Sequence, residues 1–179
     1  ATLEDARGML WTALVDPDPV LIFENGTLYN TSGELADDAG PVDIDHARVR
    51  RDGHDVSLIT YGGTLPATMR AAEELAADGL EAEVVDLRTL RPLDEETFLA
   101  SVRKTHHAVV IDEGWRSGGI SGEISGRIAE NALDDLDAPV VRVCGAEGPI
   151  PYPRHLEQAA IPNTSRIVAA ARELVGVHA

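Results

Sequence analysis

Two pairs of charged residues follow apolar runs of the sequence, and they are the first candidates for chemistry. Asp86 and Arg88 come after the run AEVV, and Asp112 and Glu113 come directly after AVVI. Carboxylates gathered at one edge of a sheet could form a general acid or a cation site. An edge on which Arg88 or Arg91 neutralises the acids explains the pattern better, because nothing in the sequence fixes the distances between the carboxylates. We therefore predict ion pairs at this edge.

Two glycine-containing motifs could bind a phosphate group. Gly62-Gly63 precedes a predicted helix, and its amides could hold an anion, but the motif lacks the spacing of a dinucleotide fingerprint or of a phosphate loop with its lysine. The run GGISGE at 118–123 also fails, because no acidic residue ends a following strand about 20 residues on. We favour a tight strand-to-helix turn for the first motif and close packing of a helix on a sheet for the second.

Histidine and cysteine give no metal or nucleophile site. His106 and His107 are adjacent on a segment that enters a predicted strand, so their side chains point to opposite faces. The other histidines show no ligand spacing: His46, His54, His155 and His178. Cys144 is the only cysteine and ends an apolar strand, where a buried, inert thiol is expected. An internal disulfide is excluded, and a reducing compartment, the cytoplasm, is the predicted location.

The composition is that of a globular protein with a strongly negative charge. The chain has 31 acids against 15 bases and a formal charge of −16. Such a surface repels nucleic acid and anionic lipid, and it attracts basic protein partners; solubility or adaptation to high salt explains the charge equally well. No segment approaches the roughly 20 apolar residues that span a membrane. We predict neither a nucleic acid nor a membrane as partner.

The first 45 residues predict part of a domain and a linker. The opening residues, ATLEDARG, lack an initiator methionine and a signal-peptide pattern, so we expect a fragment boundary and no export. Thr2 caps a predicted helix that places Leu3, Leu10 and Leu14 on one face and stops at Asp16-Pro17, and the apolar run at 20–24 predicts a buried strand. Residues 1–30 are interpreted as the remnant of a preceding domain, and 31–45 as a linker.

Residues 46–179 predict one α/β domain. Arms at 47–50 and 56–60 flank Asp52-Gly53 and predict a hairpin, and further strands are predicted at 82–86, 108–112 and 140–144. Helices alternate with these strands: one capped by Thr64 that ends near Asp78-Gly79, one capped by Asp94, one with isoleucines at 120, 124 and 128, and a last one at about 165–176 capped by Thr164. We predict a three-layer α/β/α fold whose mostly parallel sheet has an antiparallel edge strand from the hairpin.

The order of these segments resembles one family. LIFENGTLYN, VSLITYGG, HAVVIDEGW and SGEI are similar to the C-terminal half of the beta subunits of pyruvate and branched-chain 2-oxo acid dehydrogenases, and the specific motifs are VVDLRTLRPLD at 84–94 and the stretch from DAPVVRV to PYP at 137–153. The resemblance implies a transketolase C-terminal domain at 46–179. It also implies that residues 1–30 are the end of the pyrimidine-binding domain that precedes it.

The resemblance implies an enzyme that needs thiamine diphosphate and magnesium, decarboxylates a 2-oxo acid and transfers the acyl group to a lipoyl arm. In this family the cofactor and active-site residues lie upstream of this sequence or in the alpha subunit. No catalytic, cofactor-binding or metal-binding residue is therefore carried over. The chain alone is expected to bind no cofactor and to be inactive.

The resemblance also implies partners. These are the alpha subunit in an alpha2beta2 heterotetramer, a second beta subunit, and the basic subunit-binding domain of the lipoyl acyltransferase core. Relatives use the acid of the LDAP segment in that docking, which is Asp137 here; the alternative role for Asp137 is to cap the turn before a strand. Two positions depart from relatives: Arg166 stands where some carry an acid, and Ser121 where many carry glycine.

Two rival functions stay open. One is the C-terminal domain of another transketolase-like enzyme, a transketolase or a deoxyxylulose phosphate synthase. The other is a free-standing domain that binds an anion or a nucleotide at Gly62-Gly63; the apolar run at 20–24 speaks against it, because it would leave a strand without neighbours.

Overall fold

A five-stranded sheet forms the centre of the protein. The computed structural model describes residues 1–176, and its strands follow the order β1-β3-β2-β4-β5. Their bounds are Arg48–Arg51 (β1), Val56–Thr60 (β2), Ala82–Asp86 (β3), Ala108–Trp115 (β4) and Val141–Gly145 (β5). All neighbouring strands are parallel except β1, which runs antiparallel to β3.

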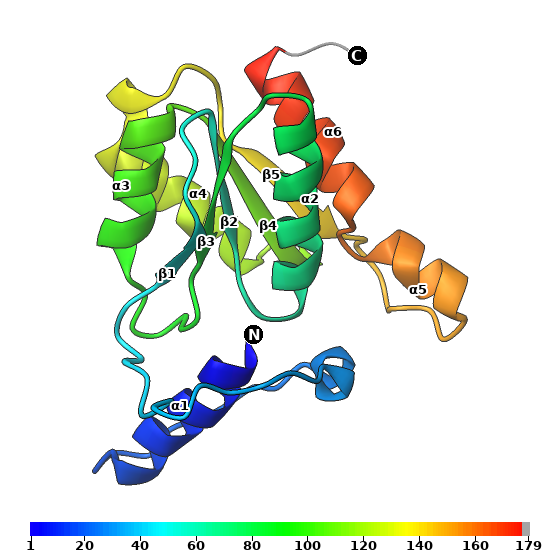
Figure 1. Cartoon of the computed structure of the whole chain (residues 1–179). Helices are drawn as coiled ribbons and strands as arrows, with labels where there is room; N and C mark the ends of the chain where they lie inside the picture. Colours follow the sequence, from blue (N-terminus) through cyan, green and yellow to red (C-terminus); the bar gives the residue numbers. More distant parts are fainter. Residues whose placement is uncertain (177–179) are drawn as a thin grey trace.

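Helices cover both faces of the sheet (Figure 1), so the predicted three-layer α/β/α fold is confirmed. α2 (Leu65–Ala77) and α6 (Thr164–Val175) pack on one face, and α3 (Glu95–Thr105) and α4 (Ile120–Asn131) pack on the other. Successive strand residues serve opposite faces: Leu58 belongs to the core under α2 and α6, and Ile59 to the core under α3 and α4. Strands buried on both faces explain the near-continuous apolar runs of the sequence.

The antiparallel edge strand is confirmed, but the predicted hairpin is wrong. β1 pairs with β3, placing Arg48 opposite Asp86, and β3 separates it from β2. The turn passes over the start of β3: the amides of His54 and Asp55 both donate to the carbonyl of Glu81, at 2.9 and 3.0 Å. A Cβ at Gly53 would lie 2.2 Å from the main-chain carbon of Ala82. The glycine therefore serves a close crossing rather than a tight hairpin.

Helix ends agree with the sequence except at two caps. The carboxylate of Asp94 accepts from the amide of Thr97 and caps α3, as predicted. Thr64 does not cap α2: it ends a short 3-10 helix, η2 (Gly62–Thr64), and its hydroxyl donates to the carbonyl of Tyr61 at 2.7 Å. Asn163 caps α6 in place of the predicted Thr164, because its side chain accepts from the amide of Arg166. A further helix, α5 (Arg154–Ala160), which is not among the helices predicted from the sequence, follows β5, and η3 (Leu133–Asp135) follows α4.

The first 30 residues contain α1 (Leu3–Val15) and the 3-10 helix η1 (Gly26–Asn30). The Thr2 cap of α1 is confirmed, since its side chain accepts from the amide of Asp5. The predicted buried strand at 20–24 is wrong: the segment is irregular, and Leu21 and Phe23 are 84% and 92% exposed. A strand needs a neighbour for its amides and carbonyls, and no described strand lies beside this segment.

Residues 31–45 have no helix or strand, yet they pack against α1. The hydroxyl of Thr12 donates to the carbonyl of Val42 at 2.6 Å, and the amide of Val42 donates to the carbonyl of Gly8 at 3.1 Å. A Cβ at Gly8 would lie 2.3 Å from Cγ2 of Val42, so only glycine allows this approach. Residues 1–45 are called the N-terminal segment below. No helix within residues 1–176 has the length and apolar character needed to cross a lipid bilayer.

Candidate functional site

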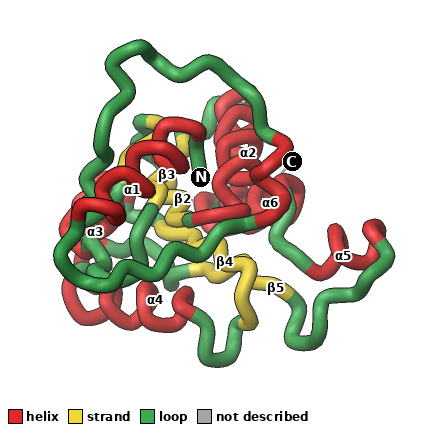
Figure 2. Tube along the Cα trace, turned by 90° about the horizontal axis from the view of Figure 1, so that it is seen from below, coloured by secondary structure: helices red, strands yellow, loops and turns green. Residues whose placement is uncertain are grey.

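The N-terminal segment lies along the carboxyl edge of the sheet. The strands β2 to β5 all end at this edge, where α/β proteins usually bind their ligands. Figures 1 and 2 show α1 and the chain that follows it running beneath the strand ends. Two groups of polar contacts join the segment to the edge, one at Asp5 and one at Asn25. The candidate site is therefore a contact between two parts of the chain.

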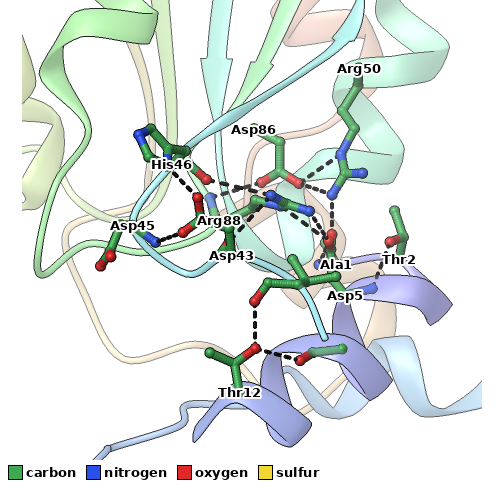
Figure 3. Close-up of polar contacts among 12 residues, drawn as sticks. Ala1, Thr2, Asp5, Thr12, Asp43, Asp45, His46, Arg50, Asp86 and Arg88 are labelled. Carbon is green, nitrogen blue, oxygen red and sulfur yellow. Dashed lines mark hydrogen bonds and ion pairs between the residues drawn. The ribbon is translucent and has the colours of Figure 1, made fainter. Parts of the chain in front are cut away.

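Four charged residues form the first contact, which we call the Asp5 cluster: Asp5, Arg50, Asp86 and Arg88 (Figure 3). Nη2 and Nε of Arg88 donate to Oδ1 of Asp5, at 2.8 and 3.1 Å. Arg50 donates to the other oxygen of Asp5, and through Nη2 and Nε to Oδ2 of Asp86, at 2.8 and 3.0 Å. Asp5 thus bridges two arginines that come from β1 and from the end of β3.

The Asp5 cluster is buried and its formal charges balance. The side chains of Asp5 and Asp86 are 1% and 0% exposed, and each carboxylate faces a guanidinium. Burial opposes the ionisation of Asp5, but the hydrogen bond from Arg88 and the charge of Arg50 outweigh it, so the pKa of Asp5 lies below its usual value. Buried charges are tolerated only when they are paired and hydrogen-bonded in this way.

The predicted ion pairs are present, with different partners. Asp86 is neutralised by Arg50, and Arg88 binds Asp5. Arg91 is exposed and makes no ion pair with a described residue; it lines a surface groove with Leu93 and Arg127. Asp5 and Arg50 were missed because their partners are remote in sequence: 83 residues separate Asp5 from Arg88. No local pattern signals such a pair.

The second contact joins Asn25 to Glu113 at the end of β4. Nδ2 of Asn25 donates to the two carboxylate oxygens of Glu113, at 3.1 and 3.3 Å. Gly63 lies directly beneath, and a Cβ there would be 2.1 Å from Nδ2 of Asn25. Burial raises the pKa of Glu113, the bond from Asn25 opposes this, and the charges of Asp112 and Glu157 add to the rise. The Gly62-Gly63 turn therefore packs against the N-terminal segment.

Asp112 has a structural role. Its carboxylate accepts from the hydroxyl of Tyr61 at 2.7 Å and from the amides of Gly114 and Ser121, at 2.8 and 3.0 Å. Burial and the bond to Asp112 raise the pKa of the Tyr61 phenol well above its usual value. Asp112 thus connects β2, β4 and the start of α4, and its oxygens are already occupied by donors of the protein.

The Gly62-Gly63 turn does not suit the diphosphate of thiamine diphosphate. The Gly62-Gly63 turn, the best anion candidate of the sequence, faces the Glu113 carboxylate, which would repel a diphosphate: a Cβ at Gly63 would lie 2.6 Å from Oε1 of Glu113. Within residues 1–176 no three His, Cys, Asp or Glu side chains are grouped as metal ligands. No catalytic step is therefore assigned to this chain.

The adjacent histidines, the cysteine and the GGISGE motif make structural contacts. Nδ1 of His106 lies 2.7 Å from the carbonyl of Asp135, and Nδ1 of His107 lies 3.1 Å from the carbonyl of Asp55. Cys144 is buried, with Sγ 3.3 Å from Oγ of Ser121. The close packing predicted for GGISGE is confirmed, since a Cβ at Gly119 would lie 2.2 Å from the carbonyl oxygen of Trp115. His178 lies outside the described residues.

Asp137 lies at the opposite, amino edge of the sheet. It belongs to the exposed loop before β5, and its amide donates to the carbonyl of His106, just before β4, at 3.0 Å. Its exposed carboxylate receives no hydrogen bond from a described residue, so a capping role has no support there. Arg166, by contrast, lies at the carboxyl edge, where Nη2 donates to the carbonyl of Cys144 at 2.7 Å.

Comparisons with known proteins agree with this architecture. The family described as "Transketolase, C-terminal domain" matches residues 45–167. The chain is 43% identical over 178 residues to the "Pyruvate dehydrogenase E1 component subunit beta, mitochondrial" of Drosophila melanogaster, covering 97% of this chain and 49% of that protein. It is 39% identical over 172 residues to the "Pyruvate dehydrogenase E1 component subunit beta" of Rhizobium meliloti, covering 96% of this chain and 37% of that protein.

Among solved structures, a "Split gene transketolase, inactive beta4 tetramer" matches with a TM-score of 0.69 and 25% identity, over 81% of this chain and 47% of that chain. The chain thus spans at most about half the length of these two beta subunits, 49% of one and 37% of the other. It belongs to the transketolase C-terminal domain family and is similar, over almost its whole length, to one half of pyruvate dehydrogenase beta subunits.

Proposed function

We propose that this chain is the C-terminal portion of the beta subunit of a thiamine diphosphate-dependent 2-oxo acid dehydrogenase, which decarboxylates the acid oxidatively and transfers the acyl group to a lipoyl group. Identities near 40% to pyruvate dehydrogenase beta subunits over almost the whole chain support it. The names of these relatives favour pyruvate over a branched-chain 2-oxo acid. A transketolase or deoxyxylulose phosphate synthase is the weaker alternative, supported by a structural match at 25% identity.

The role proposed for this portion is assembly and docking. The observation that carries it is the carboxyl edge, which is closed by the Asp5 cluster and by Asn25 on Glu113 instead of being open to a ligand. Residues 1–30 are proposed to be the end of the pyrimidine-binding domain, 31–45 the linker, and 46–179 the transketolase C-terminal domain. Thiamine diphosphate and magnesium are then supplied by the rest of the enzyme, and the isolated chain is inactive.

Exposed apolar side chains support an assembled state. Leu14, Leu21 and Phe23 of the N-terminal segment are more than three quarters exposed, and Tyr152 before α5 is 101% exposed. A contiguous run of exposed apolar residues, such as that at 20–23, is usually covered by another protein part. The proposed neighbours are the preceding domain, the alpha subunit of an alpha2beta2 heterotetramer and a second beta subunit. We keep the cytoplasm as the proposed location, supported by the single buried thiol.

Asp137 is the proposed contact for the basic subunit-binding domain of the lipoyl acyltransferase. Its exposed carboxylate could receive an arginine side chain, and arginine binds carboxylates through directional, charge-assisted hydrogen bonds. The charge of −16 would favour encounter with a basic domain.

Two measurements test the proposed function. The full beta subunit, expressed with its alpha subunit, should decarboxylate pyruvate only when thiamine diphosphate and magnesium are present; turnover of sugar phosphates alone would instead establish the transketolase alternative. In that enzyme Asp137→Ala should weaken calorimetric binding of the docking domain by about tenfold or more, as expected for a lost charged contact, and leave decarboxylation unchanged. The control is Glu73→Ala, at an exposed acid of α2 outside the proposed docking surface. Equal affinities of Asp137→Ala and the unmodified enzyme would reject the docking role.

A further inference from the structure

The loop that follows β3 has an unfavourable backbone conformation at Arg88. Its φ is +59°, in the left-handed region that residues with a Cβ avoid. The next residue has an unsatisfied polar group: the hydroxyl oxygen of Thr89 is buried and has no hydrogen-bond partner among residues 1–176. Strained positions of this kind persist only where their surroundings hold them. We call residues 88–92 the Arg88 loop.

Contacts made by the Arg88 side chain hold this conformation, and most come from the N-terminal segment. Two nitrogens bind Asp5 of α1, and Nη1 lies 3.5 Å from the carbonyl of Asp43 and from that of His46 (Figure 3). The main-chain amide of Arg88 donates to Oδ1 of Asp86 at 3.2 Å. Removing α1 would leave a guanidinium that is now 11% exposed without its carboxylate.

The ends of the loop are fixed independently. Leu87 is buried in the core under α3 and α4, and Leu93 packs against the same core. Between them Leu90, Arg91 and Pro92 are exposed, and the loop lines a groove of about 490 Å³ together with Arg127 of α4. A change in the backbone conformation of residues 88–92 would therefore leave the core contacts of Leu87 and Leu93 in place.

We propose that Asp5 acts as a strap: by docking α1 on the sheet it holds Arg88 in the left-handed conformation, and so sets the shape of the exposed Arg88 loop. When α1 leaves the edge, Arg88 relaxes to negative φ, and the hydroxyl of Thr89 turns towards water. A change in the position of the N-terminal segment therefore changes the shape of the surface beside Arg127. The inference rests on the geometry of this chain and is independent of the proposed enzyme activity.

Limited trypsin digestion of the full chain tests the strap, because the Arg88–Thr89 bond is cleavable while the Arg91–Pro92 bond resists trypsin. In Asp5→Asn, which removes the charge but keeps the side-chain shape, cleavage after Arg88 should rise about tenfold or more, since cleavage follows the population of the open loop. Cleavage after Arg70, in the middle of α2, reports global unfolding, and in the variant it should stay far slower than cleavage after Arg88, which shows that Arg88 is cut in molecules that are otherwise folded. Glu4→Gln, at an exposed acid of the same helix, should match the unmodified protein.

A second variant and a second measurement keep the test decisive. If Asp5→Asn does not fold, Asp5→Glu retains the charge and shifts it, and should give a smaller increase at the same bond. Hydrogen exchange of the amides of residues 88–91 should increase together with the cleavage. Cleavage after Arg88 that is no faster than cleavage after Arg70 in the variant, or faster exchange in α1 with an unchanged Arg88 loop, would overturn the proposal.

Discussion

Nη2 of Arg88 lies 2.8 Å from Oδ1 of Asp5, across 83 residues of sequence. The contact joins the first turn of α1 to the residue that leaves the sheet after β3. The contact lies at the carboxyl edge of the sheet, where α/β proteins usually bind a ligand. The consequences of this arrangement can be measured without knowing the substrate.

Asp5→Asn should lower the free energy of unfolding by about 3–5 kcal/mol at pH 7, because it leaves the Arg88 guanidinium without its carboxylate and removes one of the two carboxylates that bind Arg50. Urea denaturation is the measurement. Glu4→Gln is the control and should stay within about 0.5 kcal/mol, as substitutions at exposed positions usually do. A loss below about 1 kcal/mol for Asp5→Asn would mean that the pair is solvated like an ordinary surface ion pair.

The effect of Asp5 should depend on pH in one direction. Since the folded pKa of Asp5 lies below its ordinary value of 3.8, ionisation of Asp5 stabilises the fold fully above that pH and no longer does so once the pH falls through the folded pKa. The difference between the unmodified protein and Asp5→Asn should therefore be constant from pH 5 to 7 and shrink below about pH 3.8. A difference that grows on acidification would contradict the lowered pKa.

Arg88→Gly should be more stable than Arg88→Ala by roughly 1 kcal/mol, because both lose the bond to Asp5 but only alanine keeps the steric penalty at φ +59°. The matched pair is Arg70→Gly and Arg70→Ala, on an exposed position inside α2. There the order should reverse, since glycine costs about 1 kcal/mol relative to alanine in a helix. The same order at both positions would argue against strain at Arg88.

Gly63→Ala should destabilise the protein by about 1–3 kcal/mol, because the new methyl group would overlap Asn25 and displace the segment that carries it. Asn25→Ala in the same chain should recover part of the loss, and a double-mutant cycle measures this coupling. Gly126→Ala is the control: the position is an exposed part of α4 with open space around it, so the change should stabilise by about 0.5–1 kcal/mol. Additive losses at residues 25 and 63 would place the clash elsewhere.

Glu113→Gln should stabilise the protein at pH 7 and lose this advantage in acid. The folded pKa of Glu113 is raised above 4.5, so the charged side chain is disfavoured in the fold at neutral pH and the penalty disappears as the pH falls below 4.5. Glutamine keeps an acceptor for Asn25 without the charge. Thermal unfolding at pH 4 and 7 measures the effect, with Glu130→Gln on the exposed face of α4 as control. A destabilised variant at pH 7 would show that Asn25 needs the carboxylate.

The alternation of strands and helices could be predicted from the sequence because it rests on local patterns. The apolar run of β3 and the Asp94 cap of α3 act over a few residues, and both were identified correctly. The partner of β1 could not be predicted, since Asp52-Gly53 is typical of a hairpin while the decisive contact is that of Gly53 with Ala82.

The candidate site was predictable only in part. The carboxylates at the ends of β3 and β4 were recognised, whereas Asp5, Arg50 and Asn25 were not. Their roles depend on which segments the fold brings to the edge, as in the 88-residue separation of Asn25 and Glu113. The strand predicted at 20–24 was wrong for a related reason. Its apolar sequence is typical of a buried strand, but no described strand lies beside it to pair with its main chain.

The insertion of β3 between β1 and β2 has a consequence for the order of folding. When the ribosome has released β1 and β2, β1 still lacks a neighbouring strand, because β3, its partner among the described strands, is synthesised later. Arg50 on β1 and Arg88 after β3 can meet around Asp5 only once that strand is in place. Contacts between distant segments form slowly because long loops must close first. The N-terminal segment is therefore expected to dock late, as the step that completes the fold.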